Sequence, residues 1–338
     1  MAHTRFRQQP LQLAGNVASR RSGTPARLHK RSNAMRLGMV GLGKMGMNMA
    51  RRLMLSGHEV VGHNRSPAKV ERLVHEGGES AYSLEELVEK LESPRTVWLM
   101  LPAGAATIQA AHRFESLLEP GDVLIDGSNS FYKDAVRRAW ECSKKGLHCL
   151  DVGVSGGVWG LENGYCLMIG GNREQFERVE PVFKSLAQPE GYMHCGGPGA
   201  GHFVKMVHNG IEYGLMQAYA EGFAMLEDSR YGPELDYSAL SHLWNRGSVI
   251  RSWLLELAEK AFADSGRLED VKGWVEDSGE GRWTVQQAVE SGTPIPVLSL
   301  ALMERFSSRR ENDFRNRILA ALRREFGGHA VKKEGGDA

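Results

Sequence analysis

Several features that mark particular protein classes are missing from this chain of 338 residues. No apolar run reaches the roughly 18 residues that a membrane-spanning helix needs, so we expect no membrane partner. The 4 cysteines form neither a CxxC pair nor a His/Cys cluster with zinc-ligand spacing. We therefore expect no metal site, and reduced thiols as in a cytoplasmic protein.

An excess of charge of either sign is also missing. Lys and Arg number 42 and Asp and Glu number 41, which leaves a formal net charge of +1. This balance gives no reason to propose nucleic acid or an anionic membrane surface as a partner. Any bound anion must therefore be held by local groups.

The first 34 residues contain no acidic side chain but seven basic ones: Arg5, Arg7, Arg20, Arg21, Arg27, Lys30 and Arg31. An Arg-rich, acid-free leader is typical of organelle targeting peptides. We favour the alternative, an extension at the gene start, because Met35 directly precedes the first predicted strand. Residues 1–34 are excluded from the fold, and we expect a cytoplasmic protein, with an organelle as the alternative.

From Met35 onward, short apolar runs alternate with amphipathic stretches. Strands are predicted at 36–41, 59–63, 96–101, 123–126, 147–152, 165–169 and 192–195. Helices are predicted at 44–56, 67–76, 84–91, 105–118, 132–145 and 173–186. Repeated βα units of this length predict an α/β fold, a Rossmann-type doubly wound parallel sheet with helices on both faces.

Strand-like runs disappear after residue 201. Helices are predicted at 202–228, 237–244, 249–264, 297–306 and 314–326, the last ended by two glycines. We therefore predict an α/β domain over residues 35–198, an all-helical domain over 199–330 and a tail over 331–338.

A glycine-rich turn joins the first predicted strand to the first predicted helix, with the sequence Gly41-Leu42-Gly43-Lys44-Met45-Gly46. In such a turn the first glycine permits the tight bend and the second lets the backbone approach a pyrophosphate. The third allows close packing of the helix on the strand. The helix N-terminus then presents free N–H groups to the phosphates. The context predicts a dinucleotide site; the alternative is a structural turn.

The end of the second strand bears on the choice of dinucleotide. An NAD site usually has a carboxylate about 20 residues after the glycines, which accepts from the ribose. Here the region reads Asn64-Arg65-Ser66, without a carboxylate. Arg65 can offer its planar fork to a 2′-phosphate, and Ser66 a hydroxyl. We therefore expect NADP to be preferred, with NAD possible.

The long predicted helix carries polar residues at i, i+3, i+4, i+7 and i+8: Lys205, His208, Asn209, Glu212 and Tyr213. This spacing places them on one face. An ordinary solvated face is the simple alternative. Glycines within or beside the helix argue against it, because glycine at an interior position costs about 1 kcal/mol relative to alanine. A partly desolvated lysine can also act as a base, beside a glutamate as its acid–base partner.

Taken together, these residues resemble 6-phosphogluconate dehydrogenase in a short form with a single helical domain. The likeness covers nearly all of residues 35–330. It rests on the glycine turn and on four further motifs: Asp126-Gly127-Ser128-Asn129-Ser130, Val154-Ser155-Gly156-Gly157, the stripe from Lys205 to Tyr213, and the segment from Arg323 to His329.

The resemblance implies metal-free oxidative decarboxylation of 6-phosphogluconate to ribulose 5-phosphate and CO2. It implies that Lys205 takes the proton of the C3 hydroxyl as hydride leaves, and then polarises the ketone during loss of CO2. Glu212 would protonate C1 of the enediol. A cation near the developing enolate makes a metal dispensable.

The resemblance also assigns binding roles. The sugar acid would be held by Asn129, Ser155, Gly156, Gly157, His208 and Asn209. Its phosphate would be held by Tyr213, Arg305, Arg323 and His329. We include Leu101 and Pro102, at the end of a predicted strand, in the cofactor site together with Asn129. We expect a homodimer or homotetramer.

Two departures from the family pattern affect the phosphate site. Longer members duplicate the helical domain and supply the terminal arginine and histidine from a neighbouring subunit, so Arg323 and His329 could act in cis or in trans here. Longer members also carry a phosphate-binding lysine before a Gly-Lys-Trp-Thr run. That lysine is missing from the matching stretch 277–284, where Arg282 could compensate and Glu280 would disfavour an anion.

Two other functions compete with this interpretation. A dehydrogenase of a small 3-hydroxy acid such as 3-hydroxyisobutyrate would share the glycine turn, the Ser-Gly-Gly loop and the lysine. It would not need His208, Glu212 or the terminal arginines. A non-catalytic NADP-binding redox sensor would not need both proton-transfer residues.

Overall fold

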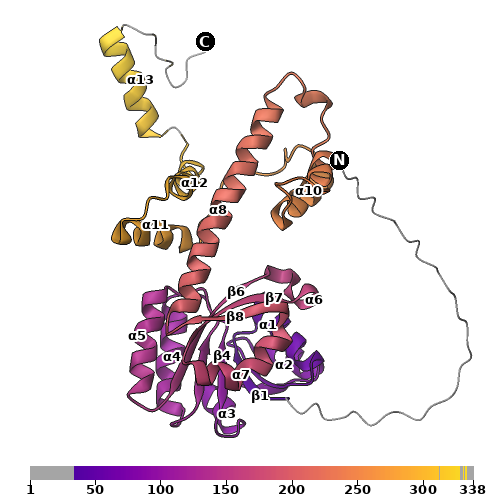
Figure 1. Ribbon diagram of the computed structural model, residues 1–338, viewed down its shortest axis with the longest axis vertical. Coiled ribbons are helices and arrows are strands. Elements are labelled where there is room, and N and C mark those ends of the chain that lie inside the picture. The colour runs from indigo at the N-terminus through magenta and orange to yellow at the C-terminus, as the bar shows by residue number, and fades with distance from the viewer. Residues whose placement is uncertain (1–33, 312, 328–329, 331, 333–338) are drawn as a thin grey trace, which may run out of the picture. The chain divides into compact units, whose positions relative to one another are not determined.

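A computed structural model describes residues 34–311, 313–327, 330 and 332 (Figure 1). The chain from Ala34 onward forms one compact unit. Among the described residues, no helix is both long enough and apolar enough to cross a membrane. Apart from Ala34, the predicted leader lies outside the described residues, as does most of the predicted tail.

The described residues contain one eight-stranded sheet with the order β3-β2-β1-β4-β5-β6-β7-β8. Its strands are β1 (Arg36–Val40), β2 (Glu59–His63), β3 (Glu79–Ala81), β4 (Thr96–Leu99), β5 (Val123–Asp126), β6 (His148–Ser155), β7 (Tyr165–Gly171) and β8 (Ala187–Gly196). Its helices are α1 (Lys44–Leu55), α2 (Pro67–His75), α3 (Leu84–Glu89), α4 (Ala105–Leu117), α5 (Tyr132–Ser143), α6 (Gly160–Asn163) and α7 (Arg173–Leu186), with the 3-10 turn η1 (Gly157–Trp159) before α6.

Two apolar layers cover the sheet, one on each face. One layer packs side chains of α1, α2 and α7, such as Leu53, Val70 and Phe183, onto the strands. The other packs side chains of α3 and α4, such as Leu87 and Phe114. Neighbouring residues of β1 enter different layers, which is why its sequence is a continuous apolar run. The Rossmann-type fold predicted from the sequence is confirmed.

The predicted parallel sheet has one exception among the described strands, because β6 and β7 pair in antiparallel fashion. Only residues 156–164 connect these strands, and they fold into the short elements η1 and α6. A parallel crossover needs about a dozen or more residues, so this connection can only reverse the chain. The three-residue strand β3 was not predicted either.

The expectation of four reduced thiols was also wrong, because Cys142 and Cys149 form a disulfide. Cys142 lies in the last turn of α5 and Cys149 in β6, and the tight turn between these elements brings the two Cα atoms to 6.5 Å. This separation is within the range that a disulfide spans. Cys166 and Cys195 are free.

A long helix, α8 (Ala200–Glu227), extends from the sheet, and the remaining helices follow it in the chain (Figure 1). These are α9 (Tyr237–Trp244), α10 (Trp253–Ser265), α11 (Glu280–Ser291), α12 (Pro296–Ser307) and α13 (Phe314–Gly327), with the 3-10 turn η2 (Gly232–Glu234) before α9. Both α11 and α12 pack along α8. The sequence did not predict α11, because its buried face consists of Glu280, Gly281, Thr284 and Ala288 rather than of large apolar side chains.

One aspartate fixes the start of α8 against the sheet. Asp151 in β6 accepts from the backbone N–H of Gly199 at 2.7 Å and from that of His202 at 2.9 Å. These are two of the donors that a helix N-terminus leaves free, and a carboxylate there also complements the helix dipole. The next turn lies so close to β6 that a Cβ on Gly153 would overlap the side chain of Lys205. The position of Lys205 is therefore set by the sheet.

Candidate active site

The glycine turn has the geometry that its sequence predicted. Gly41 has φ +97°, and a Cβ there would meet the carbonyl of Met100. A Cβ on Gly46 would meet the carbonyl of Gly41, so α1 packs closely on β1. Gly43 precedes Lys44 at the N-terminus of α1 and faces open space. An anion could therefore approach the free N–H groups of this helix.

The segment after β2 supports the same turn. The side chain of Asn64 accepts from the backbone N–H of Leu42 at 3.0 Å, which joins the end of β2 to the glycines. Arg65 and Ser66 are exposed, and Ser66 precedes the first residue of α2. Arg65 is therefore available to a ligand at the end of the sheet.

A pocket of about 460 Å³ adjoins the turn. Gly43 and four cationic residues line it: Lys44, Arg51, Lys69 and Arg72. Arg51 and Arg72 share the carboxylate of Glu76, whereas neither lysine is ion paired with a described residue. Lys69 was not predicted, because nothing in its spacing from the glycines distinguishes it from a solvated lysine of α2.

The loop after β5 lies beside the end of β4. Ser128 is buried, and its hydroxyl accepts from the backbone N–H of Leu101 at 3.2 Å and lies 3.1 Å from the hydroxyl of Thr107. Its own N–H donates to Asp126, which is paired with Arg138. These contacts hold Asn129 at the carboxyl ends of the strands, where open α/β sheets bind their ligands. Leu101 and Pro102 lie at the same end.

The polar stripe of α8 lies on one face, as predicted, and most of it is at least partly buried. Nδ1 of His208 lies 2.9 Å from Oδ1 of Asn209 and 3.9 Å from Oε2 of Glu212. Its Nε2 lies 3.4 Å from the hydroxyl of Ser155, which ends β6. The stripe and the Ser-Gly-Gly loop, 53 residues apart, therefore meet. Gly156 and Gly157 both have positive φ, so the loop turns sharply after Ser155.

Lys205 is desolvated. Burial lowers its pKa from the usual 10.5, and the nearby carboxylates of Glu212 and Glu280 raise it by less. Burial has this effect because it disfavours the ammonium form relative to the neutral amine. A lysine with a lowered pKa is suited to accept a proton.

Glu280 joins the same group of side chains, which the sequence did not reveal. It is 2% exposed at the start of α11. Its Oε1 accepts from the Nδ2 groups of Asn129 and of Asn209, the latter at 2.7 Å. These contacts span 151 and 71 residues of sequence, so no local pattern could have indicated them.

The residues expected to hold a phosphate are brought together only in part. The guanidinium of Arg305 lies over the ring of Tyr213, with its Cζ 3.6 Å from the centroid, and donates to the backbone carbonyl of Glu276. Arg282, which was expected to compensate for the missing lysine, instead places its fork on Asp277 at 2.8 and 3.1 Å. Arg282 is therefore already paired.

The terminal residues of the predicted phosphate site are not gathered with the others. Arg323 is exposed on α13, and no hydrogen bond or ion pair joins it to the site residues that the structure describes. His329 lies outside the described residues. The question of action in cis or in trans therefore stays open.

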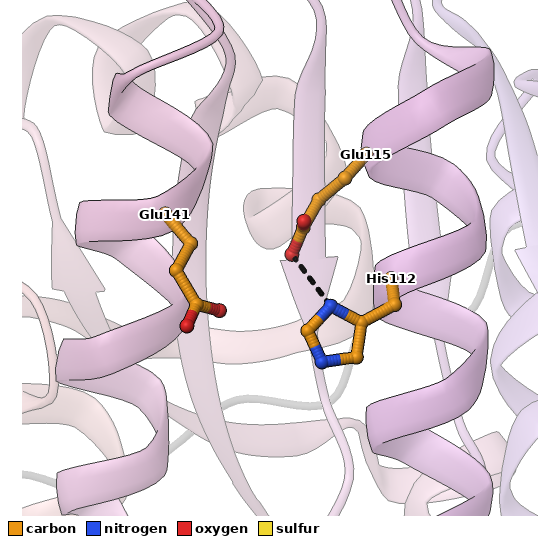
Figure 2. Close-up of side chains that lie close together, drawn as sticks. All are labelled: His112, Glu115 and Glu141. Atoms are coloured by element: carbon orange, nitrogen blue, oxygen red, sulfur yellow. Dashed lines mark ion pairs between the residues drawn. The ribbon is translucent and has the colours of Figure 1, made fainter.

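A second cluster of ligand-type side chains lies on α4 and α5 (Figure 2). His112 and Glu115 of α4 face Glu141 of α5, and Nδ1 of His112 lies 3.5 Å from a carboxylate oxygen of Glu115. The ammonium of Lys145 lies 3.5 Å from the other oxygen. Because Lys145 already supplies a positive charge to Glu115, we interpret the contacts of Glu115 as ordinary ion pairs and assign no metal to the cluster.

Comparison with known proteins matches two family models that together cover most of the chain. Residues 36–197 match the NAD binding domain of 6-phosphogluconate dehydrogenase, and residues 201–334 match the C-terminal domain of 6-phosphogluconate dehydrogenase.

Three relatives illustrate the sequence similarity. The Bacillus subtilis (strain 168) protein YqeC, provisionally named a 6-phosphogluconate dehydrogenase, is 44% identical over 89% of this chain and 100% of its own length. The NAD(+)-dependent, decarboxylating 6-phosphogluconate dehydrogenase of Haloferax volcanii is 44% identical over 89% of this chain and 99% of its own length. The NADP(+)-dependent enzyme of Bacillus subtilis is 36% identical, with 80% of this chain matching 61% of the relative.

Solved structures agree with the sequence comparison. A Plasmodium falciparum 6-phosphogluconate dehydrogenase, studied with NADP+ and with 6-phosphogluconate, superposes with a TM-score of 0.75 at 28% identity. The match covers 89% of this chain and 67% of that one. A Mycobacterium tuberculosis 3-hydroxyisobutyrate dehydrogenase gives a TM-score of 0.64 at 24% identity over 79% of this chain and 91% of that one, which shows a shared fold alone.

Proposed function

The chain belongs to the 6-phosphogluconate dehydrogenase family of NAD(P)-dependent oxidoreductases, and from this premise we propose that it oxidatively decarboxylates 6-phosphogluconate to ribulose 5-phosphate and CO2. The observation that carries the proposal is the desolvated Lys205 on the same helix face as His208, Asn209 and Glu212. The 3-hydroxy acid alternative explains the lysine but not the histidine and glutamate beside it.

The residues around the glycine turn fit a dinucleotide. Gly41 and Gly43 would let the backbone approach the pyrophosphate, and Lys44 and Lys69 would face its charge across the adjoining pocket. The exposed Arg65 and Ser66 would hold a 2′-phosphate, so we propose NADP as the preferred cofactor and NAD as a second one. Leu101, Pro102 and Asn129 would lie against the nicotinamide half. When bound, the nicotinamide supplies the hydride acceptor.

Lys205 would act first. Its neutral amine takes the proton of the C3 hydroxyl as hydride leaves C3, which yields a 3-keto acid. The ammonium so formed then donates to the ketone oxygen while the C1–C2 bond breaks and CO2 leaves. The electron pair of that bond moves toward the ketone, and the nearby cation stabilises the developing enolate without a metal.

Glu212 would complete the reaction by giving a proton to C1 of the enediol. It lies one helical turn from His208, within 3.9 Å of Nδ1, so the imidazole helps to orient the carboxyl group. As the ketone forms at C2 of the product, the enediol hydroxyl gives its proton back to Lys205. Transfer of this proton from the ammonium of Lys205 to the carboxylate of Glu212 restores the neutral amine and the protonated carboxyl group with which the reaction began.

The sugar acid would be held by Asn129, Ser155, Gly156, Gly157, His208 and Asn209. Its phosphate would contact Tyr213 and Arg305, which already stack on each other, with Arg323 and His329 completing the set. A dianionic phosphate needs several charge-assisted donors, and guanidinium forks suit it.

The decisive experiment measures reduction of NADP and of NAD with three substrates: 6-phosphogluconate, gluconate and 3-hydroxyisobutyrate. We expect reduction with 6-phosphogluconate, accompanied by equimolar CO2 and ribulose 5-phosphate. Turnover of 3-hydroxyisobutyrate without CO2 would favour the 3-hydroxy acid alternative. Tight NADP binding without turnover of any sugar acid would favour the redox sensor.

A further inference from the structure

Glu280 stands out because a buried carboxylate occupies a place where the expected substrate is itself an anion. The side chain comes from the first turn of α11 and is 2% exposed. Both of its described hydrogen bonds come from asparagine amides that are expected to contact the substrate, Asn129 and Asn209. Its second oxygen, Oε2, is buried without a hydrogen-bond partner among the described residues.

These contacts decide how the amides are oriented. A carboxylate can only accept, so each asparagine must turn its Nδ2 toward Glu280 and its Oδ1 away. Oδ1 of Asn209 then faces Nδ1 of His208 at 2.9 Å. Because Oδ1 also only accepts, Nδ1 carries the proton, an arrangement that Glu212 at 3.9 Å favours as well. In the neutral imidazole, Nε2 is then left to accept from the hydroxyl of Ser155 at 3.4 Å.

The same contacts tie two parts of the site together. Asn129 belongs to the loop after β5, whereas Asn209 belongs to α8, and Oε1 of Glu280 accepts from both. Thr284, one turn further along α11, donates to the carbonyls of Glu280 and of Met206, which fixes α11 against α8. The carboxylate is therefore held at a set position relative to the catalytic stripe.

We propose that Glu280 is a positioning residue of this active site, which orients the amides of Asn129 and Asn209 and places a negative charge beside Lys205. Its influence on catalysis rests on the function proposed above. The influence of Glu280 on the pKa of Lys205 does not depend on that function, and it can be measured without turnover.

The charges that face Lys205 define the expected effect. Carboxylates come from α8 itself (Glu212) and from α11 (Glu280), and a titratable thiol comes from β7 (Cys166). A negative charge on any of these groups opposes the lowering of the pKa of Lys205 by burial. Without the charge of Glu280, less remains to offset the effect of burial on the pKa of Lys205. That pKa should therefore fall further. More of the amine is then neutral at a given pH.

The test compares Glu280→Gln with Glu290→Gln in the full chain. Both changes remove one carboxylate from α11, but Glu290 is exposed and pairs with Lys133 rather than with the site. Each protein is treated with acetic anhydride over a range of pH, and acetylation of Lys205 is followed by mass spectrometry. We expect Lys205 of Glu280→Gln to react at least about threefold faster near neutral pH, and that of Glu290→Gln to match the wild type.

Kinetics supply the second measurement. For Glu280→Gln we expect the acidic limb of the kcat profile to move to lower pH. For Glu280→Ala we also expect KM for the sugar acid to rise about tenfold, because this change removes the acceptor that orients both amides. A purely structural role would change neither the limb nor the reactivity of Lys205. Thermal unfolding and NADP titration verify that Glu280→Gln is folded. If it is not folded, the acetylation is measured on Glu280→Ala instead.

The outcomes separate the two proposals. Unchanged acetylation of Lys205 in both Glu280 variants would overturn the positioning role, whatever the activity. If Lys205 is acetylated faster in Glu280→Gln but the wild type turns over no sugar acid, the placement of the charge is supported and the proposed function is overturned.

Discussion

Lys205 is the residue for which we propose the central catalytic role, and its burial also has a cost in stability. Its ammonium is desolvated, which lowers its pKa and disfavours the charged form in the folded chain. Replacement by methionine keeps a similar volume and removes the charge. We expect Lys205→Met to lose at least about 10³-fold in kcat, because general base catalysis of this kind contributes 10²–10⁴-fold.

The same variant distinguishes an enzyme from a sensor. NADP affinity, measured by fluorescence titration, should stay within about twofold of wild type, since Lys205 lies on α8 and not at the glycine turn. Strongly weakened NADP binding would show that Lys205 serves the cofactor rather than the chemistry.

The lowered pKa of Lys205 also predicts a pH dependence. If the neutral amine is the base, kcat/KM should rise with pH through the pKa of Lys205, with a midpoint below 10.5. The unfolded chain binds more protons than the folded chain between these two pKa values, so the free energy of unfolding should rise with pH across that window. Denaturant unfolding of wild type and of Lys205→Met at two pH values checks the sign of this dependence. The gap between the free energies of unfolding of the two proteins should be smaller at the higher pH.

Arg65 is expected to decide between cofactors. It is exposed after β2, where a carboxylate would repel a 2′-phosphate. Arg65→Asp should weaken NADP binding by about 100-fold, because a charge-assisted fork is lost and a repulsive charge is added. NAD binding should change by less than about threefold. Equal losses for the two nucleotides would contradict the assignment.

Residues could be predicted from the sequence where a regular period places them. The 3.6-residue repeat of a helix put Lys205, His208 and Glu212 on one face without knowledge of the fold. Glu280 and Lys69 could not be found in this way, since their neighbours in space lie on other elements. Only the packing of α11 on α8 makes Glu280 part of the site.

At the scale of elements, α8 provides a paired test of packing. A Cβ on Gly210 would meet Thr284 of α11, whereas a Cβ on Gly222 would meet open space. Gly210→Ala should destabilise the fold by about 1–3 kcal/mol through overpacking. Gly222→Ala should stabilise it by up to about 1 kcal/mol, because alanine favours the helix. Denaturant unfolding measures both, and equal effects would refute the close approach of α11.

The elements that the sequence predicted are those whose buried faces are apolar. The boundaries of β2, β5, α7 and α9 agree with their predicted ranges. The helix α11 escaped prediction because its contact with α8 depends on small and polar residues. The antiparallel pairing of β6 and β7 was not predicted, because the relative direction of two strands depends on the length of their connection rather than on the strands themselves.

At the scale of the whole molecule, many large apolar side chains of the helical segment are exposed. Examples are Ile211 on α8, Leu300 on α12 and Leu319 on α13, which are 50%, 63% and 60% exposed. Extended apolar surface of this kind marks interaction sites. We propose that a second copy covers it, giving the homodimer or homotetramer expected from the family resemblance. Light scattering on the purified chain measures the assembly directly.

An assembly would let Arg323 act in a neighbouring subunit, which mixing of two inactive variants can test. In hybrids of Lys205→Met with Arg323→Gln, one site would combine the intact Lys205 of one chain with the intact Arg323 of the other. Random mixing of dimers should then restore about a quarter of the wild-type activity. Action in cis would restore none.

The close approach of α8 to Gly153 limits how the substrate range of this protein can be changed by mutation. Substitutions at Ser155 or His208 alter groups that could meet a substrate and leave the backbone in place. A side chain at position 153 would instead push against Lys205 and lift the helix from the strand. A mutational library for new substrates should therefore tolerate variety at Ser155 and His208 and yield only glycine at 153, although that residue offers no chemical group of its own.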